Sequence, residues 1–249
     1  MAQKVIYTVL TGGYDRLEQP AVVSPDWDYI CYGDHDGKDG VWQLRTIPFE
    51  GCPVIRARWA KMHPHILLPE YSCSVFMDAN LRISAPEFYE TLLGSQAGIA
   101  ILEHPERDCV WEELRYCYLK DKVSTSTAVK WHRFLRKMGM PRHKGLAETN
   151  ILLREHNNPD IVALDELWWD LLVQSGGSRD QLAFTPAAYK LGLEPGLIFG
   201  PGLNSRNVPF VKYTNHPVRG GNHPGKLNWA NLKYNLRLLW RKTVLLCLT

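Results

Sequence analysis

The sequence predicts one α/β domain with a mostly parallel central sheet flanked by helices. Short β-branched or aromatic runs alternate with helical patterns along the chain, which is typical of βα units. The 249 residues are enough to bury one large core. An apolar content of 45% with 22% charged residues is that of an ordinary globular protein. Because no repeat or Pro/Ser-rich linker marks a boundary, we expect a single domain over 1–249, with a basic helical extension over about 226–249.

The expected strands are short runs of β-branched and aromatic residues, and the expected helices carry apolar residues at a 3.6-residue period. Strands are predicted at 4–10, 29–32, 42–47, 74–77, 98–102 and 149–153. Helices are predicted at 53–67, 86–93, 110–120, 128–138 and 158–174. The first helix begins with Pro53, which the first helical position tolerates, and Asn158-Pro159 resembles another helix start.

The net charge of +3 conceals an asymmetry, because eight of the 29 Lys and Arg but none of the 26 Asp and Glu follow residue 194. Such a field suits phosphate-bearing ligands, an anionic membrane or nucleic acid. No nucleic-acid-binding motif accompanies the charge, so nucleic acid is not an expected partner. Segment 227–249 places Lys233, Arg237 and Arg241 at four-residue intervals beside apolar residues. This pattern is compatible with docking on a membrane surface, although packing on the domain is favoured.

The cysteines and the apolar runs favour a cytoplasmic location. The six cysteines are scattered without a C-x-x-C pair, which disfavours a metal cluster and a disulfide framework. The first apolar run is too short for a secretory signal, and no stretch approaches the ~20 residues of a membrane span. We expect a cytoplasmic protein, and peripheral contact of its basic C-terminal helix with the inner membrane surface is the alternative to packing on the domain.

The loop after the first predicted strand is a candidate nucleotide-binding loop. In Thr11-Gly12-Gly13-Tyr14, small residues let backbone amides approach a ligand, and the Tyr14 ring could stack on a base. A simple turn at the two glycines is the alternative.

The helix from 53 carries Arg56, Arg58 and Lys61, of which at least two could face a diphosphate together. A solvated basic face is the alternative interpretation. His63 and His65 point in different directions on a helix, so they are not joint metal ligands.

Asp78 and Asn80 follow the strand at 74–77, where ligands bind in open α/β sheets. Their oxygen atoms suit Mg²⁺ or Mn²⁺ bridging two phosphates, although a D-x-D pattern would have a carboxylate at Asn80. A turn-forming Asp-x-Asn is the alternative. His216, in a Gly/Pro-rich basic stretch with Arg219 and Lys226, is a third candidate metal ligand.

Glu103 and His104 end the next strand and could orient a sugar hydroxyl or handle a proton. Ser178 and Gln181 form a capping-box pattern that leaves Arg179 and Asp180 free. A carboxylate at a helix N-terminus is held ionised, as a base or nucleophile requires.

The acidic residues around the paired tryptophans Trp168 and Trp169 are expected on the surface, and the tryptophans are expected to pack. These acidic residues are Asp165, Glu166 and Asp170.

Several sequence blocks in the same order resemble the mucilage-related/turgor-related glycosyltransferase-like domain family over roughly 4–200. They include YSCSVFMDAN, ILEHPERDCVWEE, AETNILLREHN and SRDQLAF. The resemblance implies a GT-A-like, Rossmann-related fold and transfer of a sugar from a nucleotide donor. It singles out Arg56, Lys61, Asp78, Glu103, His104, Glu148, Arg154, Arg179, Asp180 and Gln181. Members often have Lys two residues after the Asp, so Asn80 is a departure.

Together these observations predict a glycosyltransferase that moves a sugar from a nucleotide-sugar donor to a glycan or glycolipid acceptor in bacterial surface polysaccharide synthesis. Asp180 is expected to be the sugar-side carboxylate, with Glu103 second and His104 handling a proton. Donor contacts are expected from Thr11, Gly12, Tyr14, Arg56, Lys61, Asp78, Asn80, Arg179 and Gln181, and metal contacts from Asp78, Asn80 and His216.

Two other functions are weighed against this one. The first is a lipid amide hydrolase, because a plant branch of the family has been described as a ceramidase, but neither a G-x-S-x-G elbow nor an H-E-x-x-H helix supports it. The second is a non-catalytic carbohydrate-binding module.

Overall fold

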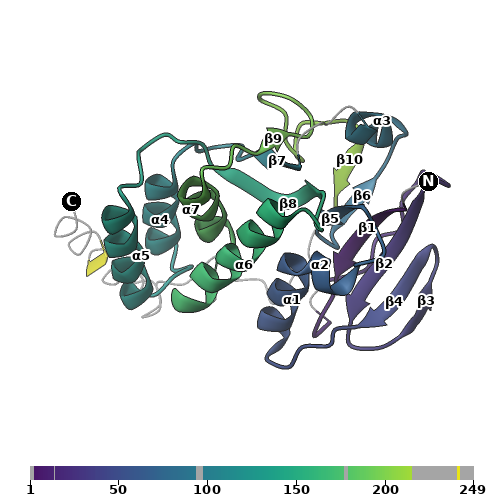
Figure 1. Ribbon diagram of the computed structural model, residues 1–249, viewed down its shortest axis with the longest axis horizontal. Helices are drawn as coiled ribbons and strands as arrows, with labels where there is room; N and C mark the ends of the chain where they lie inside the picture. The colour runs from purple at the N-terminus through teal and green to yellow at the C-terminus, as the bar shows by residue number, and fades with distance from the viewer. Residues whose placement is uncertain (1–2, 14, 94–97, 177–178, 215–239, 242–249) are drawn as a thin grey trace, which may run out of the picture.

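A computed structural model of the chain describes residues 3–13, 15–93, 98–176, 179–214 and 240–241. Its centre is an eight-stranded sheet in the order β3-β4-β2-β1-β5-β8-β7-β9, beside a two-stranded sheet of β10 and β6 (Figure 1). The strands are β1 (Lys4–Val9), β2 (Trp27–Gly33), β3 (Gly37–Asp39), β4 (Trp42–Thr46), β5 (Cys73–Met77), β6 (Leu81–Ile83), β7 (Ile99–Glu103), β8 (Ala147–Arg154), β9 (Gly196–Leu197) and β10 (Val211–Tyr213). All six predicted strands are confirmed, and the α/β prediction with them.

Strand directions decide which residues meet. Strands β4, β2, β1 and β5 are mutually parallel neighbours, whereas β8 is antiparallel to both β5 and β7. Strands β5 and β7 therefore run in the same direction, and β1, β2, β5 and β7 all end at one side of the sheet, here called the carboxyl end. Because β8 runs the opposite way, it begins at this end, where Ala147 lies opposite Glu103.

Helices cover the sheet on both faces. They are α1 (Pro53–Met62), α2 (Pro64–Leu67), α3 (Glu87–Leu93), α4 (Val110–Leu119), α5 (Thr125–Met138), α6 (Pro159–Gln174) and α7 (Gln181–Leu191). In Figure 1, α3 and the β6–β10 pair lie on one side of the sheet, and the other helices lie on the opposite side. Side chains alternate along a strand, so Val5 and Tyr7 of β1 enter one core while Ile6 enters the other.

The helix ends follow local chemistry. The predicted helix at 53–67 is two helices, because Pro64 lacks an N–H and disfavours helical geometry at His63, whose ψ is 49°. Ser124 caps α5 by accepting from the Thr127 amide at 3.1 Å, so α5 begins at Thr125, three residues before the predicted start. Asn158 caps α6, as predicted.

The prediction that Asp165 lies on the surface is wrong. Its side chain is fully buried and pairs with Arg154 of β8 at 2.9 Å. Burial raises the pKa of Asp165 to about 6, against the opposing effect of Arg154. Arg154 also donates to the Tyr7 hydroxyl and, at 2.8 Å, to the Lys61 carbonyl. This buried network therefore fixes the end of α1 against β1 and β8.

Among the described residues, no helix combines the length and apolar character needed to span a bilayer. Trp168 is fully buried, so its predicted packing role is confirmed.

Candidate functional site

A cluster of charged side chains lies at the carboxyl end of the sheet, where α1, α7 and β8 meet. Asp180 Oδ2 forms ion pairs with Lys61 Nζ at 2.7 Å and with Arg58 Nη1 at 2.8 Å. Lys61 also donates to Thr149 Oγ1 at 3.2 Å, and that hydroxyl donates to Asp180 at 3.3 Å. We call Arg58, Lys61, Thr149 and Asp180 the cation cluster.

Secondary structure positions each member of the cation cluster. Arg58 and Lys61 are three residues apart on α1 and so share one helical face. Asp180 precedes α7, and its carbonyl accepts from Trp168 Nε1 at 2.7 Å and from the Ala183 amide at 3.0 Å. The backbone of Asp180 is therefore held on two sides while its carboxylate faces α1.

The cation cluster keeps Asp180 ionised. Burial alone would raise the pKa of this carboxyl, but Arg58 and Lys61 outweigh burial and hold the pKa well below its ordinary range. The Lys61 side chain is 3% exposed and that of Asp180 is 8% exposed, whereas that of Arg58 is 27% exposed. Arg58 is thus the cation of the cluster that is most accessible to a ligand.

Asp78 lies beside the cation cluster, immediately after β5. Its amide donates to the Asn150 carbonyl of β8 at 2.9 Å. Burial raises the pKa of the half-buried Asp78 carboxyl, Lys61 and Arg58 lower it, and Asp180 and Asp15 raise it further. The three charges of the cation cluster, together with Asp15, therefore act on the Asp78 carboxylate, as expected of a site that binds a charged ligand.

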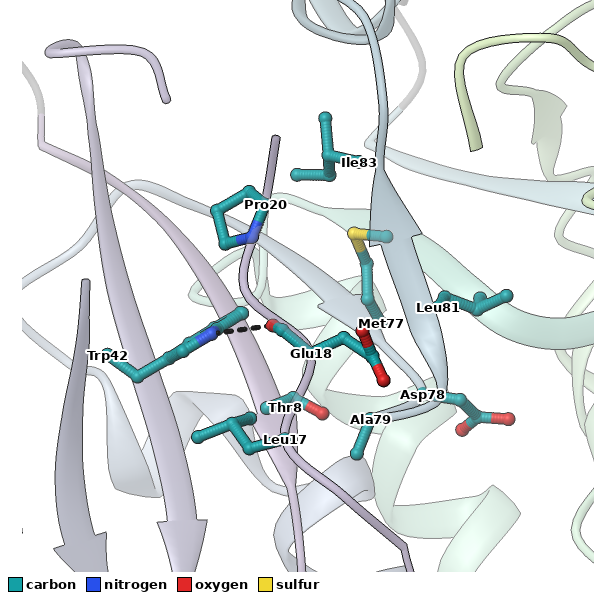
Figure 2. A pocket seen from close by; sticks show the side chains of 10 residues that line it. All are labelled: Thr8, Leu17, Glu18, Pro20, Trp42, Met77, Asp78, Ala79, Leu81 and Ile83. Carbon is teal, nitrogen blue, oxygen red and sulfur yellow. Dashed lines mark hydrogen bonds between the residues drawn. The ribbon is translucent and has the colours of Figure 1, made fainter. Parts of the chain in front are cut away.

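Figure 2 shows the other side of the Asp78 segment. A cavity of about 10 Å³, with room for about one water molecule, lies between Thr8, Trp42, Met77 and Asp78. The Thr8 hydroxyl is buried and has no hydrogen-bond partner among the described residues. In Figure 2 the Asp78 carboxylate points away from Trp42 and the other apolar side chains.

A second polar cluster contains Glu148 and Asn150, which alternate with Thr149 along β8 and so face the opposite side of the sheet. Glu148 accepts from the Ser205 hydroxyl at 2.9 Å. Asn150 donates to Ser205 Oγ at 2.8 Å and to the Tyr213 hydroxyl at 2.6 Å. Burial raises the pKa of Glu148, the bonds from Ser205 lower it, and the Asp78 charge adds to the rise.

This second cluster, Glu148, Asn150, Ser205 and Tyr213, is called the amide cluster. Asn150 Oδ1 is buried and has no partner among the described residues. A buried acceptor without a donor is uncommon and suits a ligand hydroxyl. The resemblance singled out Glu148, but Asn150, Ser205 and Tyr213 were missed. The available signal was the run Glu148-Thr149-Asn150, three consecutive polar residues in a buried strand that is otherwise apolar except for Arg154.

Arg56 lies away from the cation cluster, against the ends of β1 and β2. Its Nη1 pairs with Asp34 Oδ1 at 2.6 Å, and the Gly12 amide donates to Asp34 Oδ2 at 2.9 Å. The Gly12 amide and, further, Arg56 hold the pKa of Asp34 below its ordinary value. Thr11 donates to the Pro53 carbonyl at 2.8 Å. The glycine loop is thus tied to the start of α1, and Asp34 was missed by sequence reasoning.

Glu103 and His104 contact loops and not the cation cluster. Glu103 accepts from the Gly202 amide at 2.7 Å. His104 Nδ1 accepts from the amides of Glu106 and Arg107 at 3.1 and 3.0 Å, and burial lowers its pKa.

Ion pairs connect this loop region to the amide cluster. Arg107 pairs with Glu113 at 2.6 Å and with Glu106 at 3.0 Å. Arg206 pairs with Glu106 at 3.3 Å and with Glu148 of the amide cluster at 4.0 Å.

The capping-box interpretation is wrong for Gln181. Its amide donates to the Ala147 carbonyl of β8 at 3.0 Å, because α7 packs on that strand and brings the side chain to a strand carbonyl. The cap residue of α7 is Asp180, and Ser178 lies outside the described residues.

The other predicted site residues are placed as follows. Asn80 is buried, and its carbonyl accepts from the Thr214 amide at 2.8 Å. Arg179 is half-buried and near enough to Cys117 to lower the pKa of that thiol, which burial raises to about 12. Tyr14 and His216, with Arg219 and Lys226, lie outside the described residues.

The chain is similar to several solved structures and to one family model. No curated protein matches the sequence. The similar solved structures include two glycosyltransferases. The first is the apo structure of the WbbM bifunctional glycosyltransferase, with 8% identity, a TM-score of 0.44, and coverage of 79% of this chain and 38% of that one. The second is mouse xyloside xylosyltransferase 1, with 10% identity, a TM-score of 0.41, and coverage of 76% and 80%. The chain thus spans well under half of WbbM.

The model of the TOD1/MUCI70 glycosyltransferase-like domain matches residues 31–199, which include Arg58, Lys61, Asp78, Glu148 and Asp180. More than half of the sequence lies in this match, and the chain therefore belongs to the TOD1/MUCI70 glycosyltransferase-like domain family.

Proposed function

We propose that the protein transfers a glycosyl group from a nucleotide-sugar donor to a hydroxyl of a glycan or glycolipid acceptor. The observation that carries this proposal is the meeting of Arg58, Lys61, Asp180 and Asp78 at the carboxyl end of the sheet. Glycosyl transfer builds negative charge on the departing phosphate and positive charge on the sugar. A site of this kind needs cations and carboxylates side by side.

Arg58 and Lys61 are proposed to stabilise the departing diphosphate. Arg58 is partly exposed and has a planar fork of donors, so it can bind phosphate while Lys61 supplies a buried charge behind it. The loop at Gly12 and Gly13 lies at the same end of the sheet, and both residues have positive φ, 62° and 61°. The Gly13 amide is proposed to line the nucleotide side of the site, while Asp34 holds both the Gly12 amide and Arg56.

Asp180 was expected to be the sugar-side carboxylate, and its contacts favour a different role. Two cations and a hydroxyl all engage its Oδ2, and the cations hold its pKa low, so the carboxylate is a weak base. We assign it the positioning of Arg58 and Lys61.

Glu148 is the better candidate for the proton acceptor. Its pKa is raised and its carboxylate lies within electrostatic reach of Asp78. In the proposed step the acceptor oxygen bonds to the anomeric carbon, the bond from that carbon to phosphate breaks, and the acceptor proton passes to Glu148.

Asp78 is the residue that would hold Mg²⁺ or Mn²⁺. Among the described residues no group of three His, Cys, Asp or Glu side chains could hold a metal ion. The half-buried Asp78 carboxylate fits an ion held by one protein carboxylate and the donor phosphates, an arrangement that Mg²⁺ commonly adopts. When bound, such an ion would neutralise charge on the diphosphate. Asn80 and His216 remain proposed ligands.

Nucleotide binding tests the proposal. UDP, GDP and CMP, each with and without Mn²⁺, are screened for thermal stabilisation of the full chain. Arg58→Ala is expected to weaken the stabilising nucleotide about tenfold or more, because a charge-assisted contact to phosphate is lost. Arg45→Ala is the matched control, since Arg45 is also partly exposed and also pairs with a carboxylate, but on β4. The proposal is wrong if no nucleotide stabilises the protein, or if Arg58→Ala and Arg45→Ala bind the stabilising nucleotide equally.

The acceptor class is tested separately. The proposed setting is bacterial surface polysaccharide synthesis in the cytoplasm, at the inner membrane surface. Transfer of labelled sugar to extracted glycolipid is the expected result. Release of a fatty acid from ceramide, without sugar transfer, would instead support a lipid amide hydrolase.

A further inference from the structure

Helix α5 carries a basic face that the proposed transfer chemistry does not use. The helix contains Lys130, His132, Arg133, Arg136 and Lys137 and no acidic residue. Lys130, Arg133 and Lys137 follow the i, i+3, i+7 spacing of one helical face, and all three are exposed. None of these three forms an ion pair with any residue that the structure describes. Their charge is therefore available to an anionic partner.

An apolar groove adjoins this basic face. It has a volume of about 280 Å³ and lies between α5 and α6. Trp131, Phe134 and Leu171 supply its apolar wall, and Lys130 and Arg133 lie at its border.

Polar residues of α6 complete the surroundings of the groove. Gln174 and Ser175 are its polar lining on that side. Asp170, one helical turn before Gln174, is an exposed carboxylate on the same helix. The four exposed cations of α5 outnumber the three exposed acids of α6, which are Asp160, Glu166 and Asp170.

Two described residues near the C-terminus, Trp240 and Arg241, also lie at this end of the molecule. Arg241 pairs with Asp121, in the connection that leads from α4 to α5, and donates to the Val123 carbonyl at 3.3 Å. Its guanidinium lies 4.7 Å from the centre of the Tyr118 ring. The neighbouring Trp240 is 63% exposed. In Figure 1 these two residues, coloured yellow, lie beside α5.

We propose that the α5–α6 surface docks the protein on a membrane that contains anionic phospholipid. Lys130, Arg133 and Lys137 bind headgroup phosphates, and the half-buried Phe134, backed by the buried Trp131 and Leu171, contacts the glycerol and upper acyl region. The combination favours lipid over nucleic acid, because phosphate backbones need only the cations, whereas a bilayer interface also takes up aromatic and aliphatic surface. The inference does not depend on the proposed transfer reaction.

Vesicle flotation of the full chain tests the proposal. The probes are phosphatidylcholine vesicles and vesicles of phosphatidylcholine mixed with phosphatidylglycerol. The wild type is expected to bind only the mixed vesicles, and more weakly as salt is raised. Lys130→Glu/Arg133→Glu is expected to weaken binding about tenfold or more, because each basic residue near an anionic surface contributes separately.

The matched control is Lys38→Glu/Arg82→Glu, which changes net charge equally at exposed positions on β3 and β6. It is expected to bind as the wild type does. Phe134→Ala is expected to reduce the binding that persists at high salt, and its melting temperature shows whether the fold is intact.

Three outcomes would overturn the proposal. The first is equal binding of the wild type to both vesicle types, and the second is equal loss in the two double variants. The third is a labelled oligonucleotide that binds through Lys130 and Arg133 while vesicles do not.

Discussion

Replacing Asp180 with asparagine removes the charge that Lys61 and Arg58 share while keeping nearly the same shape. Lys61 Nζ lies 2.7 Å from Asp180, and its side chain is 3% exposed, so the variant leaves a buried ammonium without its carboxylate. Breaking a buried pair in this way costs about 3 to 5 kcal/mol. For a chain of this length each kcal/mol lowers the melting temperature by about 2 to 4 °C. The expected loss is therefore about 6 to 20 °C.

Calorimetry and urea unfolding measure this cost, and pH gives a second readout. The folded-state pKa of Asp180 is depressed, so its contribution is fully present above the unfolded pKa of about 3.9 and is lost as pH falls through the folded pKa. The stability difference between wild type and Asp180→Asn is expected to be constant from neutral pH down to about pH 5 and to shrink only in stronger acid.

The double variant Asp180→Asn/Lys61→Met separates loss of the pair from exposure of an unpaired charge. It is expected to recover part of the stability lost in Asp180→Asn, because the uncompensated ammonium is gone. A cost below about 1 kcal/mol for Asp180→Asn would refute the reasoning, since a cost of that size is typical of a solvated surface pair. A double variant less stable than Asp180→Asn would refute it as well.

Three further predictions concern the proposed site. Glu148→Gln is expected to lower the transfer rate about 10²-fold or more. In the wild type the transfer rate is expected to fall in acid at a pH above the ordinary glutamate pKa, because the pKa of Glu148 is raised, and the variant is expected to lose this fall. An unchanged pH profile would exclude Glu148 as the base. Gly12 and Gly13 both have positive φ, but a Cβ at Gly12 would lie 3.0 Å from Pro53 Cβ, whereas a Cβ at Gly13 would have nothing within 4 Å. Gly12→Ala is therefore expected to weaken nucleotide binding and to lower the melting temperature more than Gly13→Ala does. The reverse order would contradict the proposed loop. Asp78→Asn is expected to abolish any Mn²⁺ enhancement of nucleotide binding, and calorimetry that shows the enhancement intact would place the ion elsewhere.

Much of the fold could be predicted because local signals encode its elements. β-branched runs located β1, β2, β4, β5, β7 and β8, and Asn158-Pro159 located the start of α6. The short strands β3, β6, β9 and β10 were missed, since two or three residues carry no measurable period and form only because a neighbour pairs with them.

By itself, the sequence determined that Asp78 follows a buried strand and that at least two of Arg56, Arg58 and Lys61 share a helical face, because strand length and helical period are local properties. Only the tertiary structure decided what those groups meet. Lys61 and Asp180 are 119 residues apart, and their contact depends on α7 packing against β8 beside α1. The reversed direction of β8 brings Glu148 and Asn150 to the same end of the sheet as Asp78. Asp165 appeared to be a surface acid because the chain gives no local sign that Arg154, on another element, would compensate its buried charge.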